Sequence, residues 1–197
     1  MKLPIVDAPL PLRLRLSRPM TEDELLRFCR VNDVLWVERE VNGELSVKPI
    51  GGCRVSSVNL AVGCALRDWA DEDGRGETFA NAGFTLPDSS VRAADAAWVS
   101  WERWNALTRR QQKSYAPLCP EFVIEVRSES DRLEPLREKM QMWLDNGAEL
   151  AWLIDPERRT VEIYRIGQSP EVLHDPSSVQ GNGPVAGFEL VMERVWQ

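Results

Sequence analysis

A carboxylate stands in the middle of an apolar stretch in the second half of the chain. Residues 121–127 alternate in a way that predicts a strand. One face of this strand carries only apolar side chains: Phe122, Ile124 and Val126. Glu125 shares the other face with Arg127, and a buried carboxylate is costly unless it is paired. Either Glu125 forms an ion pair with Arg127, or it binds a metal ion at the centre of a site.

Two further acids and a lysine could join Glu125. A helix is expected from about Leu133 to Asn146, and Lys139 lies at the edge of its apolar face, from which it can reach the sheet. Asp95 begins an apolar run and is either a turn-former or a second buried acid. Two acids from neighbouring strands are a common ligand arrangement for Mg²⁺. Glu44, on the strand after an Asn-Gly turn, could be a third acid.

The side-chain inventory excludes several other chemistries. The single histidine, His174, lies in a Pro-rich tail segment, where a solvated loop histidine is favoured over a general base. The four cysteines form no Cys-x-x-Cys pair, so a zinc site is not expected, and they are typical of small buried hydrophobes in a reducing compartment. Both glycine-rich phosphate-binding motifs are missing, which argues against a nucleotide cofactor. Chemistry must therefore rest on carboxylates, Lys, Arg, Ser and an oxygen-preferring metal.

The length of 197 residues predicts one domain, residues 1–197, whose first 17 residues form an arm or an edge strand. No apolar run approaches the roughly 18 residues of a membrane span. The N-terminus lacks a secretory signal, so the expected location is the cytoplasm. The formal charge of −7 counts against broad nucleic-acid affinity. A nucleic-acid function would therefore need a local basic patch and divalent ions.

The order of the expected elements indicates an α/β domain with a mixed central sheet. Thr21 and Glu24 form a capping box that begins a helix ending near Val31. Asn42-Gly43 predicts a hairpin with a two-residue turn. The remaining elements are a helix over 53–72, strands over 77–80, 83–86 and 95–100, a short helix over 101–107, strands over 150–154 and 160–165, and a loop-rich tail.

Several of these segments together resemble a known family. They are Pro120 to Arg132, the segment 136–139 that holds Lys139, and the segments 143–147, 152–156 and 161–164. Together they closely resemble the Uma-two family of restriction endonucleases, which is placed in the PD-(D/E)xK nuclease superfamily. Upstream segments around 20–24, 42–45 and 83–88 fit as well, so the resemblance covers about residues 18–195.

The resemblance implies a restriction-endonuclease-like core: a mixed central β-sheet flanked by α-helices, with an N-terminal helix and β-hairpin. It also implies hydrolysis of phosphodiester bonds in DNA with Mg²⁺ or Mn²⁺. By motif, Asp95 and Glu125 correspond to the two metal-binding acids and Glu44 to the acid of the Asn-Gly-Glu strand. Arg127 occupies the usual lysine position, and Lys139 would supply the cation from the following helix. In this scheme Lys139 positions or deprotonates the attacking water, and Arg127 neutralises developing charge.

Three departures from the family pattern keep an alternative open. The proline before the first acid is Ala94, residues 53–57 contain no histidine, and Arg127 cannot deprotonate water. The alternative is a catalytically inactive protein of the same fold that acts as a binding or assembly module. A third hypothesis is a nuclease acting on RNA or on special DNA structures. A homodimer is expected by analogy, since cleavage of both strands usually needs two sites.

Overall fold

The computed structural model describes residues 11–33 and 35–197. The helices are α1 (Glu22–Val31), α2 (Cys53–Asp73), α3 (Trp101–Asn105), α4 (Arg109–Gln112) and α5 (Leu133–Asp145), with two 3₁₀ turns at Gly183–Val185 and Met192–Arg194. The strands are β1 (Leu12–Leu14), β2 (Leu35–Arg39), β3 (Leu45–Pro49), β4 (Gly76–Ala80), β5 (Gly83–Thr85), β6 (Val91–Ala93), β7 (Ala96–Ser100), β8 (Phe122–Val126), β9 (Leu150–Asp155), β10 (Thr160–Arg165), β11 (Glu171–His174), β12 (Ser178–Gln180) and β13 (Glu189–Val191).

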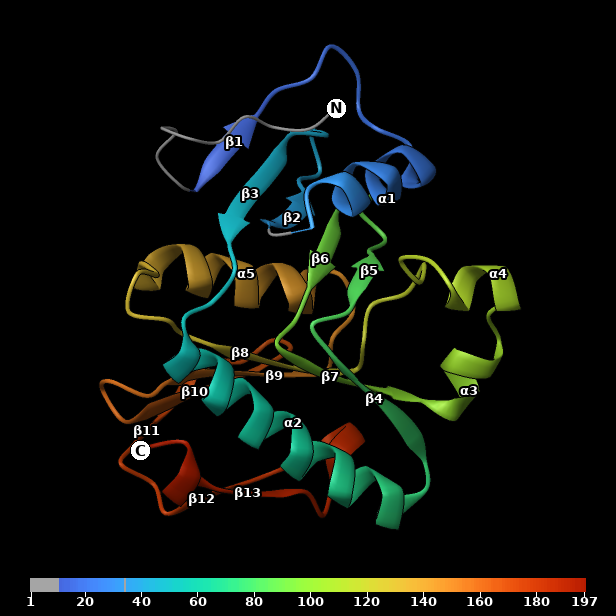
Figure 1. Cartoon of the computed structure of the whole chain (residues 1–197). Coiled ribbons are helices and arrows are strands. Elements are labelled where there is room, and N and C mark those ends of the chain that lie inside the picture. The colour runs from blue at the N-terminus through green and yellow to red at the C-terminus, as the bar shows by residue number, and fades with distance from the viewer. Residues whose placement is uncertain (1–10, 34) are drawn as a thin grey trace.

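The strands form two large sheets and one small one. The six-stranded sheet has the order β11-β10-β9-β8-β7-β4, and the five-stranded sheet has the order β1-β3-β2-β6-β5. In the larger sheet β8 and β9 run parallel while the other neighbours run antiparallel, so this sheet is mixed. Helix α5 makes the crossover that a parallel pair requires. Figure 1 shows the five-stranded sheet above the six-stranded one, which is seen almost edge-on.

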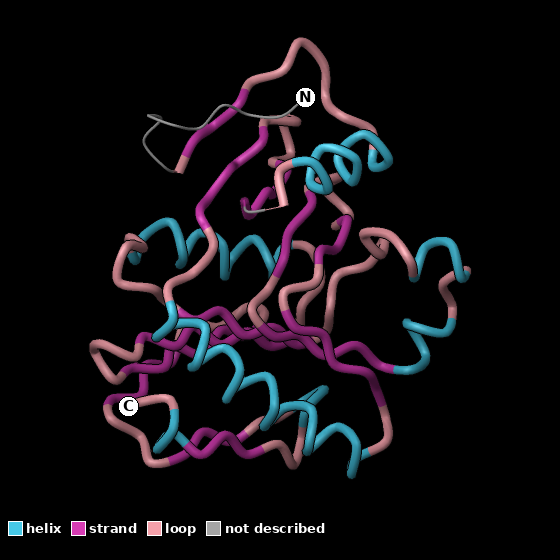
Figure 2. The backbone as a smooth tube through the Cα atoms, in the orientation of Figure 1, coloured by secondary structure: helices cyan, strands magenta, loops and turns pink. Residues whose placement is uncertain are grey.

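The six-stranded sheet lies between two layers (Figures 1 and 2). Helix α5 covers the face turned toward the five-stranded sheet, and α2 with the β12–β13 hairpin covers the other face. The alternation of β8 follows these layers. Phe122, Ile124 and Val126 pack in the cluster that includes α2, whereas Val123 packs with α5. Glu125 therefore faces the α5 layer, as its spacing from Val123 requires.

The expected elements are largely confirmed, with one change at the hairpin. The capping box of Thr21 and Glu24 is present at the start of α1. The β2–β3 hairpin forms, but its turn is not a two-residue turn. Glu40 N–H donates to the Glu44 carbonyl at 2.8 Å, so three residues lie between this pair. Gly43 has a φ of +82°, the left-handed conformation that such a longer loop requires of its last residue.

Some short elements were not expected from the sequence. Strand β6 and helix α4 fall in segments for which neither a strand nor a helix was predicted, and the tail contains β11, β12 and β13. His174 is the last residue of β11 and is exposed. Strand β1 pairs with β3 at one edge of its sheet, which confirms the edge-strand interpretation for residues 12–14. The rest of the proposed arm up to residue 10 lies outside the described residues.

None of the helices in the described residues is long and apolar enough to cross a membrane. This finding agrees with the absence of an apolar run of that length in the sequence.

Two glycines in this packing should respond in opposite directions to alanine. A Cβ at Gly76 would lie 2.5 Å from the Val99 carbonyl oxygen and would overlap the Trp98 ring, so β4 or β7 would have to move. A Cβ at Gly63 meets nothing within 4 Å. We expect Gly76→Ala to lower the free energy of unfolding by about 1–3 kcal/mol. Gly63→Ala, in the middle of α2, should raise it by roughly 0.5–1 kcal/mol. Urea denaturation of the two variants checks this, and equal effects would contradict the packing at Gly76.

Candidate active site

Asp95 lies where the chain passes from one sheet to the other, between the end of β6 at Ala93 and the start of β7 at Ala96. The β7–β8 ladder begins with Ala96 opposite Ile124, and one further step of this register places Asp95 opposite Glu125. Beyond the ladder, the Val126 N–H donates to Asp95 Oδ2 at 2.7 Å. The structure therefore brings Asp95 and Glu125 together.

Lys139 connects this pair of acids to the five-stranded sheet. Its Nζ lies 2.8 Å from Glu125 Oε1 and 3.1 Å from Glu38 Oε1. It also donates to the Ala93 carbonyl oxygen at 2.9 Å. An ammonium group has three donors, and these three acceptors can use all of them. The side chain is 13% exposed, so α5 delivers a largely buried cation to the acids, as the position of Lys139 at the edge of the apolar face predicted.

Glu38 is a site residue that sequence reasoning missed. It lies on β2 and is only 4% exposed. Besides Lys139, it accepts a hydrogen bond from the Ala93 N–H at 3.2 Å, and Arg92 Nη1 lies 3.9 Å from its Oε2. The sequence did carry a signal for Glu38, because it is an acid inside an expected strand, between Val37 and Arg39. Glu125 is likewise an acid inside an expected strand. The contact that the five-stranded sheet makes with Lys139 could not be predicted from that pattern.

The acid proposed on the Asn-Gly-Glu strand is placed elsewhere. Glu44 ends the hairpin loop, where its Oε1 accepts from Arg15 Nε at 2.7 Å and its N–H donates to Asn42. The Arg15 guanidinium holds the pKa of Glu44 below its usual value. The third acid that the structure brings to the site is Glu38, beside Lys139, and not Glu44.

Arg127 also has other partners than the acids of the site. Its Nη1 forms an ion pair with Asp155 at 2.7 Å, and its Nε donates to the Asp131 carbonyl oxygen at 3.1 Å. The Glu125–Arg127 pair considered from spacing is thus not formed, because Glu125 pairs with Lys139. Trp143 Nε1 adds a hydrogen bond to Glu125 Oε1 at 2.9 Å.

The charges of the site shift one another's ionisation. Burial raises the pKa of Glu125 to about 7, with Lys139 opposing the shift and Asp95 adding to it. Burial also raises the pKa of Asp95, against the Val126 N–H and Lys139. Burial would lower the pKa of Lys139, but Glu125 and Glu38 together raise it above its usual value. These ion pairs favour the protonated form of Lys139 and count against a role in deprotonating water, whereas its role in positioning the water stays a prediction.

The raised pKa of Glu125 predicts a pH dependence of stability. The folded protein keeps this proton up to about pH 7, whereas the unfolded chain loses it near its usual pKa of 4.5. Between these values the folded state binds more protons, so the contribution of Glu125 to stability falls as pH rises. As the pH rises from 4.5 to 7, we expect the free energy of unfolding of Glu125→Gln to fall less than that of the unmodified protein. Urea denaturation in EDTA across this range measures it, and parallel profiles would contradict the assignment.

Asn59 of α2 reaches Asp95 from the opposite layer. Its Nδ2 donates to Asp95 Oδ1 at 2.7 Å. Its own Oδ1 is buried and has no hydrogen-bond partner among the described residues. The Val126 N–H of β8 therefore holds one oxygen of Asp95, and the Asn59 amide holds the other oxygen from the α2 side. Sequence reasoning did not single out Asn59, since an asparagine on the edge of an apolar helix face has no distinctive spacing.

The donor set suits a hard cation that keeps water ligands. Across the described residues, no three His, Cys, Asp or Glu side chains come together in a ready-made metal cluster, because Lys139 lies between Glu38 and Glu125. Two adjacent carboxylates and one unpaired amide oxygen remain, from Asp95, Glu125 and Asn59. Mg²⁺ commonly takes one or two carboxylates and completes its shell with water. The residues present therefore fit such an ion.

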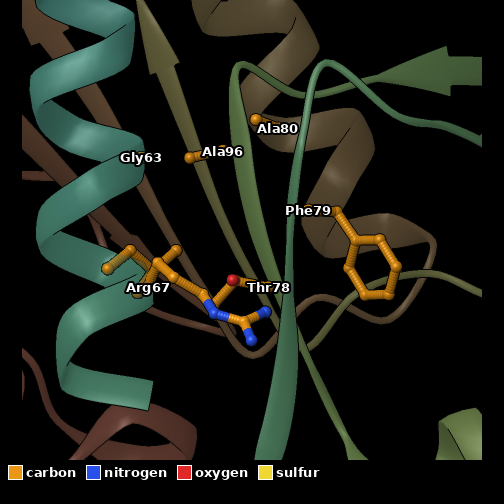
Figure 3. A pocket seen from close by; sticks show the side chains of 7 residues that line it. Gly63, Arg67, Thr78, Phe79, Ala80 and Ala96 are labelled. Atoms are coloured by element: carbon orange, nitrogen blue, oxygen red, sulfur yellow. The ribbon is translucent and has the colours of Figure 1, made fainter. Parts of the chain in front are cut away.

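A small cavity lies on the α2 side of the six-stranded sheet, apart from the site (Figure 3). It has a volume of about 230 Å³ and lies between α2 and the strands β4 and β7, with Ala96, the neighbour of Asp95, in its wall. Figure 3 shows Arg67 and Thr78 extending into the space and the Phe79 ring pointing away from it. Arg67 is already paired with Asp71 and Glu77. None of the clustered acids or Lys139 lines this cavity, so it is separate from the site.

Comparison with solved structures shows the same fold elsewhere. A crystal structure from Anabaena variabilis, described as a "putative nuclease belonging to DUF820", superposes with a TM-score of 0.74 at 20% sequence identity. The match covers 90% of this chain and 98% of that one, and the expected restriction-endonuclease-like fold is thereby confirmed. A cryo-electron microscopy structure of a DrdV–DNA complex matches at a TM-score of 0.42 and 18% identity, over 64% of this chain and 11% of that chain.

The search of curated proteins finds no match. A family model does match: Uma2, described as "Putative restriction endonuclease", aligns with residues 22–193. This range includes Glu38, Asp95, Glu125 and Lys139. Since the match spans most of the sequence, the chain belongs to the Uma2 family of restriction-endonuclease-like proteins.

Proposed function

We propose that the protein is a metal-dependent endonuclease that hydrolyses phosphodiester bonds in DNA. The observation that carries the proposal is the meeting of Asp95 and Glu125 at the ends of two adjacent strands, with the Lys139 ammonium 2.8 Å from Glu125. Family membership supports the reaction class. Buried carboxylates with raised pKa values destabilise the fold. A cluster of them is therefore more typical of a functional site than of a purely structural one.

Asp95 and Glu125 would hold Mg²⁺ or Mn²⁺ in this scheme. A divalent ion supplies polarisation of a phosphodiester oxygen and a lower pKa for bound water. Lys139 and Trp143 both approach Oε1 of Glu125, so Oε2 is the oxygen that remains for a ligand. Lys139 keeps its proton, orients Glu125 and offers positive charge near the phosphate. The proton of the attacking water would pass to bulk solvent, since the divalent ion would lower the pKa of that water.

The acidity of the chain bears on how DNA would bind. The net charge of −7 repels a polyanion, so affinity depends on local cations and on divalent ions in the site. We infer by analogy that two copies act together, since residues 11–33 and 35–197 hold one such cluster and duplex cleavage needs two cuts. Sedimentation of the protein with and without a DNA duplex tests this homodimer.

The experiment that tests the function is cleavage of a supercoiled plasmid. We expect nicked and linear products with Mg²⁺ or Mn²⁺ and none with EDTA. The same assay with single-stranded DNA and with RNA tests the hypothesis of a different nucleic-acid substrate. Intact plasmid under all metal conditions, with an otherwise folded protein, would contradict the proposal.

One observation favours the alternative of an inactive binding or assembly module. Arg127, at the usual lysine position, is committed to Asp155, and all three donors of Lys139 have acceptors within the protein. A site closed in this way could serve stability alone. Calorimetric titration with Mn²⁺ separates the two hypotheses, because an inactive module should give no heat of binding at the site.

A further inference from the structure

Asn59 stands out on α2 because it lies beside an apolar row. Val58, Val62 and Leu66 on this helix are buried in the core, and Asn59 follows the first of them. Its Nδ2 donates to Asp95 Oδ1 at 2.7 Å. In this hydrogen bond Asp95 Oδ1 is the acceptor, so the amide nitrogen of Asn59 is the atom turned toward Asp95. The amide oxygen is then directed away from that carboxylate oxygen.

The environment of this amide oxygen provides no hydrogen-bond donor among the described residues. Asn59 Oδ1 is buried without a hydrogen-bond partner among the described residues. The other orphaned side-chain atoms in that part of the chain are hydroxyl or N–H groups, which can act as donors: Ser90 Oγ, Arg92 Nε, Trp98 Nε1 and Trp152 Nε1. A carbonyl oxygen only accepts, so it requires a donor or a cation. Buried polar atoms without partners are rare and call for an explanation such as a bound ion or water.

We propose that Asn59 Oδ1 is the third protein oxygen of the cation site, alongside the carboxylates of Asp95 and Glu125. This inference rests on the proposed function. An amide oxygen is a good ligand for a hard cation, and it adds no charge to a site that already holds three acids. The Asn59 amide would thus have two roles: its nitrogen orients Asp95, and its oxygen binds the cation directly.

The test separates the two roles with two variants. Asn59→Leu removes both the donor and the oxygen, whereas Asn59→Asp removes the donor and keeps oxygen ligands. Calorimetric titration with Mn²⁺ gives the affinity of each variant. We expect at least a 10-fold weaker affinity for Asn59→Leu and an affinity equal to or tighter than that of the unmodified protein for Asn59→Asp. Ser57→Ala, on the exposed side of the same helix, is the control and should bind as the unmodified protein does.

A second readout does not depend on activity. The melting temperature in EDTA reports whether each variant folds, and its rise on adding Mn²⁺ reports binding. In Asn59→Asp a new negative charge beside Asp95 destabilises the metal-free protein, so its rise with Mn²⁺ should exceed that of the unmodified protein. In Asn59→Leu the rise should be smaller.

The outcomes distinguish this inference from the proposed function. Unchanged Mn²⁺ affinity in Asn59→Leu would overturn the role of Asn59 and leave the two-acid site standing. Equal weakening in both variants would also overturn it, because the nitrogen would then be the group that matters. An unmodified protein that binds no Mn²⁺ would refute the metal site of the proposed function itself.

Discussion

Replacing Lys139 with methionine should lower the free energy of unfolding by about 3–5 kcal/mol at pH 8, the cost of leaving buried charges without their partner. Lys139 is the cation nearest to both Glu125 and Glu38, whose side chains are each 6% exposed. Methionine fills similar volume, so the loss reports charge rather than packing. The loss should shrink toward pH 5, since the pKa values of the acids rise further without Lys139 and the acids then take up protons. Urea denaturation at the two pH values measures this.

A second variant separates charge from structural damage. Glu38→Gln combined with Lys139→Met removes one charge of each sign, so the double variant should be more stable at pH 8 than Lys139→Met alone. The exposed Lys113→Met is the control and should change stability by less than about 0.5 kcal/mol. A double variant no more stable than the single one would contradict the ion-pair arrangement.

The sequence predicted those parts of the fold that local patterns encode. The capping box at Thr21 and the alternation around Glu125 each depend on neighbours within a few residues, and both match the structure. The β2–β3 loop is one residue longer than expected, because Asn-Gly also suits a three-residue loop with Gly43 in the left-handed region. Strand β6 has three residues and no alternation long enough to detect, and its pairing with β2 is non-local.

The site shows the same division between local and non-local information. Lys139 could be expected near Glu125 because one helical face and one strand face determine both positions. Glu38 comes from a separate sheet, and only the packing of that sheet against α5 brings it to Lys139. Asn59 approaches from the opposite layer. Residue spacing along the chain does not predict which side chains from two different layers meet at the end of one strand. Glu38 and Asn59 could therefore be assigned to the site only from the structure.

Asp95→Asn should lower the rate of plasmid cleavage with Mg²⁺ by roughly 10³-fold. Losing one charged ligand removes several kcal/mol of transition-state stabilisation, and about 1.4 kcal/mol corresponds to a factor of ten. The variant should fold, because its amide oxygen can still accept from the Val126 N–H and the Asn59 amide can turn its oxygen toward the new nitrogen. Initial rates on supercoiled plasmid at fixed Mg²⁺ measure the effect.

A matched pair of glutamate variants tests where the third acid lies. Glu38→Gln should lower the same rate, because Lys139 then loses one of the two carboxylates that position it beside Glu125. Glu44→Gln should cleave at the unmodified rate, since Glu44 contacts Arg15 in the hairpin loop. Because both variants remove one negative charge from the same hairpin, a general effect of charge on DNA binding would appear equally in both. A slow Glu44→Gln beside a fast Glu38→Gln would contradict the site as built here and return the third acid to the Asn-Gly-Glu strand.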